Sequence, residues 1–217
     1  MERKSINTID DSEKKSVGRK SDKTRRRIME ATKALISQGK YTAKITDIAR
    51  AANIAQPHFY IYFSSVQDVV YAISEEIYET ANEGFKIPAD TDWNSEQGFL
   101  IVRAAVEAGF AKWKENYAIN SIGQLLSDKE DGRFRKLRIG RFQAISKIFV
   151  EKIREAQQQG RLHPSINASL RAHQCVNVLA NMAQHYDSFI SCGYSHQQVI
   201  DDCTHLLINL VGFSTKF

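Results

Sequence analysis

The fold is decided by the stretch ITDIARAANIAQPHFYIYFSSVQDVV, which spans residues 45–70. Its first part predicts a short helix, because Ile45, Ile48 and Ala52 share one face at helical spacing. A tight link follows at Asn53, a residue type that adopts the left-handed conformation more readily than most others. Two short helices joined by such a link form a helix-turn-helix pattern.

The second helix of this pattern begins near Pro57, since proline fits the first helical turn, where its missing N–H is not needed. Phe59 and Phe63 lie four residues apart, and we expect both rings to anchor the helix inward. Ile54, together with the small residues of the first helix, is expected to pack between the two helices. The outward positions are polar or aromatic: Gln56, Pro57, His58, Tyr60 and Tyr62.

The rest of the chain also has helical periodicity, and no stretch predicts a strand. A helix from Ser21 or Asp22 to Gly39 precedes the motif, and the polar residues 1–21 are expected to form a mobile tail. Further helices are predicted at about 64–85, 94–117, 132–159 and 167–192, and after the capping-box pair Ser195 and Gln198. The prediction is an all-α fold: a flexible basic tail (1–21), a three-helix helix-turn-helix DNA-binding domain (22–66), and a larger helical ligand-binding and dimerisation domain (67–217).

The charge is concentrated at one end of the chain. The 217 residues carry 30 Lys+Arg and 25 Asp+Glu, a net charge of +5. Residues 1–65 hold fourteen basic and seven acidic groups, so this part carries +7 and the remainder −2. An excess of positive charge at the helix-turn-helix favours a polyanion partner, and nucleic acid before a membrane surface.

Residues 45–70 resemble the TetR (tetracycline-repressor-like) family of bacterial transcription regulators, and the resemblance covers roughly residues 22–75. It implies a homodimer whose recognition helices enter successive major grooves of a palindromic operator in double-stranded DNA. By position, the resemblance makes Gln56, Pro57 and His58 base-edge readers and Tyr60 and Tyr62 phosphate contacts. A Gln amide can pair with adenine, and a Tyr hydroxyl can reach phosphate. The resemblance also implies DNA-backbone or minor-groove contacts from Arg25, Arg26 and Arg27.

The sequence departs from the family pattern at three places. Val66 stands where members often have a Lys that contacts phosphate. Ala43 and Lys44 occupy the region of a common capping Thr, and Lys44 is a candidate phosphate contact in compensation. Asn53 replaces the usual turn Gly.

The helical body offers a candidate pocket for a small, largely apolar effector. The residues expected to line it are Phe110, Trp113, Tyr117, Asn120 and Phe142, with Phe99, Asn116 and Gln124 beside them. The alternative is that these aromatics are ordinary core, because aromatic residues at helical spacing usually are. A basic cluster from Arg133 to Arg141 is either a solvated helix face or an anion site for an effector head group or DNA backbone. The last two helices are expected to form the homodimer interface as a four-helix bundle.

Other classes of protein have no support in the sequence. No phosphate-binding loop, nucleophile elbow or dinucleotide fingerprint is present, so no enzyme is predicted. No cofactor or metal site is expected, because the histidines and cysteines lack ligand spacing. The chain has no apolar run of membrane length and no signal peptide, which favours the cytoplasm and reduced, buried Cys175, Cys192 and Cys203.

The function predicted from these features is a ligand-responsive repressor that a small molecule releases from its operator. One alternative is a DNA-binding regulator or architectural protein without an effector. A second is a helical enzyme or membrane-surface protein with a basic tail.

Overall fold

The computed structural model of the chain describes residues 11–128 and 131–214, and within these ranges all regular structure is helical. The chain divides into two compact units, Met1–Ile73 and Ser74–Phe217. The prediction of an all-α fold is confirmed. The helices are α1 (Asp11–Ser37), α2 (Ile45–Ala51), α3 (Gln56–Tyr62), α4 (Val66–Gly84), α5 (Glu96–Glu115), α6 (Tyr117–Asp128), α7 (Gly132–Gln158), α8 (Ala168–Gln184), α9 (Tyr186–Ser191) and α10 (His196–Leu210).

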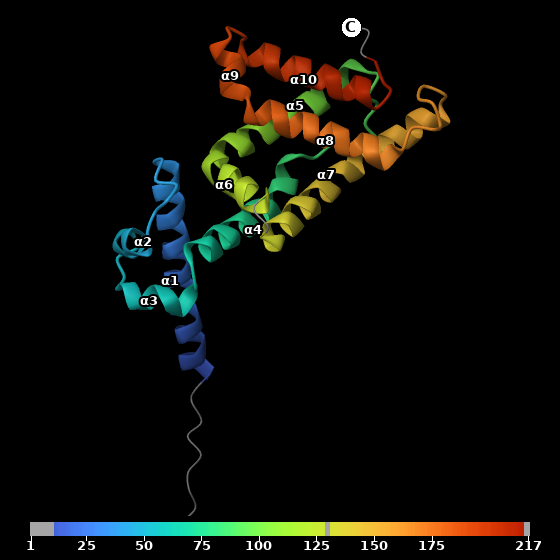
Figure 1. Cartoon of the computed structure of the whole chain (residues 1–217). Coiled ribbons are helices and arrows are strands. Elements are labelled where there is room, and N and C mark those ends of the chain that lie inside the picture. Colours follow the sequence, from blue (N-terminus) through green and yellow to red (C-terminus); the bar gives the residue numbers. More distant parts are fainter. Residues whose placement is uncertain (1–10, 129–130, 215–217) are drawn as a thin grey trace, which may run out of the picture. The chain divides into compact units, whose positions relative to one another are not determined.

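The first unit packs α2 and α3 beside α1 (Figure 1). Its core is formed by large apolar side chains with almost no exposed surface, among them Ile28 and Ile36 of α1, Ile48 of α2 and Phe59 of α3. Val69 from the start of α4 is also buried. Burying each such side chain contributes about 1.5–3 kcal/mol, so this small core is enough to hold two seven-residue helices that would not be stable alone.

The turn between α2 and α3 depends on Asn53, whose φ of 50° lies in the left-handed region, as the sequence predicts. The N–H of Asn53 donates to the carbonyl oxygen of Arg50 at 3.1 Å, and the N–H of Ile54 donates to that of Ala49 at 3.0 Å. These bonds close the C-terminal end of α2. Pro57 then lies in the first turn of α3, which again agrees with the prediction.

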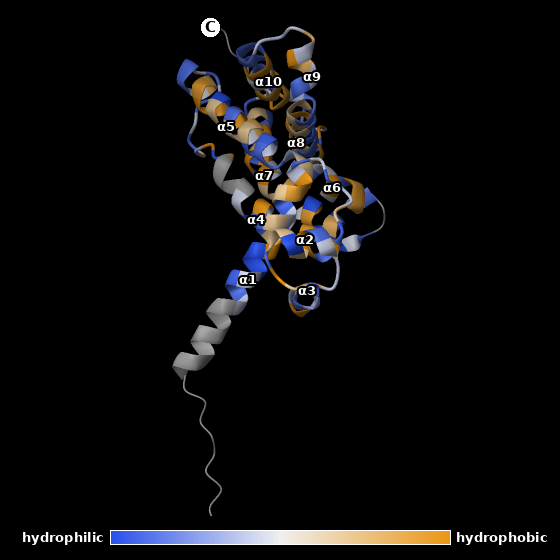
Figure 2. Ribbon diagram, turned by 90° about the vertical axis from the view of Figure 1, so that its left-hand side faces the viewer, coloured by the Kyte–Doolittle hydropathy of each residue, from blue (hydrophilic) through white to orange (hydrophobic). Residues whose placement is uncertain are grey.

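The second unit buries its core between α5, α7, α8 and α10. In Figure 1, α8 runs beside α10 and α9 joins them at one end. Figure 2 shows hydrophobic residues alternating with hydrophilic ones along α5, α8 and α10, the pattern of helices that are buried on one side. Trp93, Phe149, Ile153, Leu207 and Ile208 form the centre of this core.

Two helix starts in the second unit follow the sequence signals. The Ser195 hydroxyl accepts from the Gln198 N–H at 3.2 Å, and the Gln198 side chain accepts from the Ser195 N–H at 2.8 Å. The capping box predicted for the last helix is therefore present. Asn167, where the sequence places the start of the preceding helix, caps α8 by accepting from the Leu170 N–H at 3.0 Å.

Several boundaries differ from those expected. Helix α1 already begins at Asp11, within the segment predicted as a mobile tail, and the rest of that segment, residues 1–10, lies outside the described residues. The helix α6 was not predicted, and the single helix expected over 167–192 is divided at His185 into α8 and α9. The division between the two units falls after Ile73, inside α4, whereas the sequence places it after residue 66.

The cysteines are only partly as expected. Cys175 and Cys203 are buried free thiols, and burial raises the pKa of each to about 12, so both stay protonated near neutral pH. Cys192 is exposed, because it lies past the end of α9 in the turn that leads to α10. The expectation of a third buried cysteine was wrong.

The left-handed turn predicts opposite effects for two substitutions at Asn53. Asn53→Ala should lower the free energy of unfolding of the first unit by about 1 kcal/mol, since a Cβ without a polar side chain disfavours this conformation. Asn53→Gly should leave stability unchanged or raise it, because glycine adopts positive φ at no steric cost. Thermal unfolding followed by circular dichroism measures both. Equal stability of the Ala and Gly variants would contradict the role given to the turn.

Candidate functional site

The outer side of α3 carries the residues expected to meet a partner. Gln56, Pro57 and His58 are exposed, and Tyr60 keeps 55% of its surface accessible. Tyr62 is half-buried, so it offers less of its ring than Tyr60. The structure thus brings four of the five predicted side chains of α3 onto an open surface of the first unit.

The opposite side of α3 is fixed in the core of the unit. Phe59 and Phe63 are buried, with ring centroids 6.2 Å apart, as the four-residue spacing predicts. The ring of Phe59 also meets that of Tyr60 edge-on at 5.8 Å. Because Phe59 is fully buried, this contact orients the exposed Tyr60 ring beside it.

Arg27 of α1 holds the turn between α2 and α3. Its Nη2 atom donates to the carbonyl oxygen of Ala52 and, at 2.8 Å, to that of Asn53. The last carbonyls of a helix have no partner within the helix, and a cation there also complements the helix dipole. Ala52 is the residue that caps α2. The guanidinium therefore stabilises the geometry on which the position of α3 depends.

The three arginines that were predicted to contact DNA have different environments. Arg25 lies over the ring of Phe63, with its Cζ 5.0 Å from the centroid, and contacts the sulfur of Met29. Arg27 binds the turn. Arg26 is exposed, and among the described residues it forms a long ion pair with Glu30, at 3.9 Å. In this structure Arg25 and Arg27 interact with their own unit, and Arg26 faces outward. The sequence carried no signal of this division.

Lys44 is exposed at the start of α2, where its own backbone N–H donates to Asp47 Oδ2 at 3.4 Å. Asp47 thus supplies the half of a capping box that the third helical residue gives, while Lys44 makes no side-chain cap bond of the kind a threonine would give. The Lys44 ammonium extends into solvent from the same short helix.

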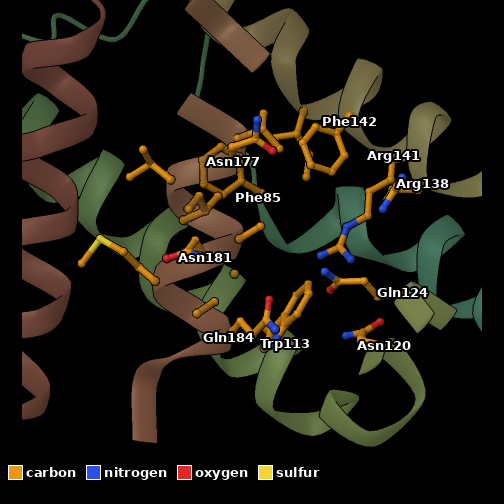
Figure 3. Close-up of a pocket in the computed structure, with 18 of the residues that line it drawn as sticks. Phe85, Trp113, Asn120, Gln124, Arg138, Arg141, Phe142, Asn177, Asn181 and Gln184 are labelled. Atoms are coloured by element: carbon orange, nitrogen blue, oxygen red, sulfur yellow. The ribbon is translucent and has the colours of Figure 1, made fainter. Parts of the chain in front are cut away.

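The second unit contains a cavity of about 920 Å³ (Figure 3). Three of the five predicted effector residues line it: Trp113 of α5, Asn120 of α6 and Phe142 of α7. Gln124, which the sequence places beside them, lines it as well. The cavity wall is completed by residues of α4, α8 and α10.

Phe110 and Tyr117 do not line the cavity. Phe110 is buried in the core, where its ring meets Tyr186 edge-on at 6.0 Å. Tyr117 opens α6 after the break at Asn116 and is 47% exposed. The prediction assumed one continuous stripe through residue 117, and the start of a new helix turns Tyr117 out of that register.

Other lining residues were missed by the sequence analysis. Tyr78 and Phe85 come from α4 and its end, and Asn177, Asn181 and Met182 come from α8. Asn177 and Asn181 are one helical turn apart, and this spacing indicates that both lie on one face of the helix. Nothing in the sequence indicates which other helix that face meets. The cavity is created by packing between helices that are distant in sequence.

The basic cluster of α7 separates into different roles. Arg133 pairs with Asp131, which caps α7, at 3.0 Å, and Arg138 pairs with Asp128 at 3.0 Å. Arg141 instead lies between two aromatic rings, its Cζ 5.4 Å from the Tyr78 centroid and 5.2 Å from that of Trp113. Only Arg138 and Arg141 of this cluster reach the cavity.

Among residues 11–128 and 131–214, no group of three or more His, Cys, Asp or Glu side chains is arranged to hold a metal ion. Among the same residues, no helix has the length and apolar character needed to cross a membrane.

Comparison with protein families gives two matches that together cover most of the chain. Residues 28–73 match the family described as bacterial regulatory proteins, tetR family. Residues 86–215 match the tetracyclin repressor-like C-terminal domain. The first match contains the helix-turn-helix, and the second contains all helices from α5 to α10.

Solved structures with the same fold include three bacterial proteins at low sequence identity. The fatty acid degradation regulator FadR from Bacillus halodurans has a TM-score of 0.62 at 17% identity, over 85% of this chain and 94% of that one. A tetR-family transcriptional regulator from Streptomyces coelicolor has a TM-score of 0.65 at 14% identity, over 87% and 80%. GusR of Salmonella enterica has a TM-score of 0.61 at 16% identity, over 87% and 95%. A search of curated proteins finds no significant match.

The contacts of Arg27 predict a local effect of its removal. Arg27→Met keeps the apolar stem but removes both bonds to the turn, and should make opening of residues 49–56 easier by about 1 kcal/mol. Amide exchange in that segment should then be roughly fivefold faster. Hydrogen exchange followed by mass spectrometry is the suitable measurement, because both tryptophans lie in the second unit and do not report on the first.

Arg26→Met is the matched control. It removes the same charge from the neighbouring position, where the side chain forms a long pair with Glu30 and does not bind the turn in the described part of the chain. Exchange in the turn should then stay as in the unmodified protein. If both variants change exchange equally, the effect comes from net charge and the assigned role of Arg27 is wrong.

Proposed function

Because the chain belongs to the TetR family of bacterial transcriptional regulators, we propose that it is a repressor that binds a palindromic operator as a homodimer and is released by a small-molecule effector. DNA binding and dimer formation are properties of the family. The repressor role, the operator and the effector are the parts that we add.

The observation that carries the proposal is the two-sided character of α3. One side is buried through Phe59 and Phe63, and the other presents Gln56, His58 and Tyr60 to solvent. A short helix that is rigid on one side and polar on the other suits insertion into a major groove. The Gln56 amide is the best candidate for reading an adenine edge, and the Tyr60 hydroxyl for a phosphate oxygen. Pro57 and Tyr62 are proposed to support these contacts.

The charge supports the same partner. Residues 1–65 carry a net +7, whereas the rest of the chain carries −2. Exposed Arg26 and Lys44 are proposed as phosphate contacts, while Arg25 and Arg27 contribute to the positive potential from within the unit. A cationic surface of this kind accelerates association with DNA and makes affinity depend strongly on salt.

We further propose that the homodimer forms through α8 and α10, two helices from each subunit making a four-helix bundle. Leu170 of α8 is 61% exposed and Leu206 of α10 is 40% exposed, so both helices offer apolar surface that a second copy would cover. Two recognition helices related by a twofold axis would then meet half-sites about 34–36 Å apart.

The cavity of the second unit favours an effector-controlled regulator over one without an effector. Its volume of about 920 Å³ is in the range that accommodates small molecules, and its wall combines aromatic side chains with a few polar groups. The proposed effector favours a conformation in which the two recognition helices no longer match consecutive grooves. The effector can shift the equilibrium between the two conformations only by as much as its affinities for them differ. We place the protein in the cytoplasm, where bacterial operators are, and assign it no catalytic activity or cofactor.

The proposal predicts different effects for two substitutions on α3. Gln56→Ala should weaken binding to the operator by about 1–3 kcal/mol and leave binding to random duplex DNA nearly unchanged, because a base contact is lost. Tyr60→Phe should weaken binding to both DNAs about equally, because a phosphate contact carries no sequence information. Fluorescence anisotropy with both duplexes measures the difference.

Gln97→Ala is the control, since Gln97 is an exposed glutamine of the second unit, outside the proposed interface. It should change neither affinity. Affinity of the unmodified protein for both duplexes should fall steeply as salt increases. An equal loss on operator and random DNA with Gln56→Ala would remove Gln56 from the base-reading residues.

A further inference from the structure

The charged side chains that line the cavity of the second unit are cationic, among the residues that the structure describes. This inference rests on the proposed function, in which that cavity holds the effector. Among the described residues that line it, Lys112, Arg138 and Arg141 are cationic, and none is Asp or Glu. A wall of this kind favours anionic ligands and disfavours cationic ones.

The three cations differ in what already neutralises them. Lys112 Nζ lies 3.5 Å from Glu115 Oε2, and Arg138 Nη1 lies 3.0 Å from Asp128 Oδ1. For Arg141, no ion pair with a carboxylate is formed within the described part of the chain. Its neighbours are the faces of Tyr78 and Trp113.

The environment of Arg141 is unfavourable for a charge that has no counter-ion. Burial is the main cause that lowers the pKa of its guanidinium, and the Tyr78 hydroxyl opposes this. A guanidinium nevertheless stays protonated in proteins, so the charge remains. Aromatic faces compensate a buried cation only in part. In Figure 3 the Arg141 side chain extends into the cavity toward Gln124 and Trp113.

The guanidinium of Arg141 hydrogen-bonds the Tyr78 hydroxyl, and a polar group of Trp113 lies nearby without such a partner. The indole N–H of Trp113 is buried and forms no hydrogen bond with any described residue. A buried donor without an acceptor is unfavourable, unless a ligand or water supplies the acceptor. Trp113 lines the cavity, and its ring lies 5.2 Å from the Arg141 Cζ.

The remainder of the wall suits an apolar body rather than a polar one. Phe85, Phe142 and Met182 line the cavity together with Ile145. Figure 3 shows Phe85 and Phe142 on one side of the space and Asn120 and Gln124 on the other. The charged head group of a ligand and its apolar body would therefore lie against different parts of the cavity wall.

We propose that the effector is an organic monocarboxylate with an apolar body. Its carboxylate accepts hydrogen bonds from the Arg141 guanidinium and the Trp113 indole N–H, and its apolar part lies against Phe85 and Phe142. Arg141 selects the carboxylate because a planar guanidinium can donate two parallel bonds to it. Arg138, which lines the same cavity but is paired with Asp128, is not needed for this recognition.

The test measures binding of three acids and their alcohols to the full-length dimer by isothermal titration calorimetry. The pairs are phenylbutyrate and phenylbutanol, naphthoate and naphthalenemethanol, and decanoate and decanol. At least one acid should bind about 10- to 100-fold more tightly than its alcohol, the difference that loss of charged hydrogen bonds produces. If no acid binds, or each alcohol binds as well as its acid, the proposal is wrong.

Two substitutions at the proposed site and one control test whether Arg141 and Trp113 cause the preference for the acid over its alcohol. Arg141→Met should remove the preference for the acid, and Trp113→Phe should reduce it about fivefold while keeping the aromatic face. Arg138→Met should keep the preference. Circular dichroism establishes that each variant is folded. If Arg141→Met does not fold, Trp113→Phe alone decides. An acid preference that is unchanged in the folded variants overturns the assignment.

Measuring whether each compound releases DNA tests the ligand class and the effector-controlled release independently. An acid that binds through Arg141 without weakening DNA binding supports the ligand class and contradicts effector-controlled release. A neutral compound that fills the cavity and releases DNA, with no acid doing so, supports release and contradicts the ligand class.

Discussion

The guanidinium of Arg27 ties α1 to the turn between α2 and α3, and the arrangement of the first unit depends on this contact. Asn53 has a left-handed backbone, and the helix that ends beside it leaves carbonyl groups without partners inside the helix. Arg27 binds the carbonyl of Ala52, which caps the helix, and that of Asn53 in the turn. The angle between two short helices is thereby set by a polar contact as well as by the apolar core. Gln56 and His58 lie on the exposed side of α3, the second of these helices.

The chemistry of the two units is different. The first unit presents polar groups outward from a small rigid core, which suits contact with an extended polyanion. The second unit contains a cavity lined by Arg141, which has no carboxylate partner among the described residues, and by Trp113, whose indole N–H has no hydrogen-bond acceptor among them. Helix α4 contributes residues to both units, because Val69 belongs to the first core and Tyr78 to the cavity wall. Any effector acts on DNA binding only through its unequal affinity for two conformations of the chain.

Much of the fold was predictable because local signals determine it. The spacing of Phe59 and Phe63, the left-handed preference of Asn53 and the reciprocal cap of Ser195 and Gln198 all act over a few residues. Errors arose where local signals are weak. The segment from Asp11 is polar and lacks an apolar stripe, although its lysines and glutamates are good helix formers. The ends of α5 and α8 at Asn116 and His185 are not marked by glycine or proline.

The candidate sites were predictable to different degrees. The α3 surface follows from one short helix whose faces can be assigned from spacing, so four of its residues were located correctly on the open side. The cavity requires knowledge of which helices meet. Trp113, Asn120 and Phe142 line it, but the same periodicity also included Phe110 and Tyr117, which point elsewhere. Contacts such as Arg27 with Ala52, or Arg141 with Tyr78, join residues far apart in sequence, and periodicity contains no information on them.

The measurement that tests the central claim most directly is footprinting of the purified protein on DNA from upstream of its own gene. A dimer that reads DNA with two α3 helices should protect a palindrome whose half-sites are centred about one helical turn, roughly 34–36 Å, apart. Protection should be lost at high salt. Uniform protection without a preferred sequence, or a single unpaired half-site, would contradict the claim that this chain is a dimeric, operator-reading regulator.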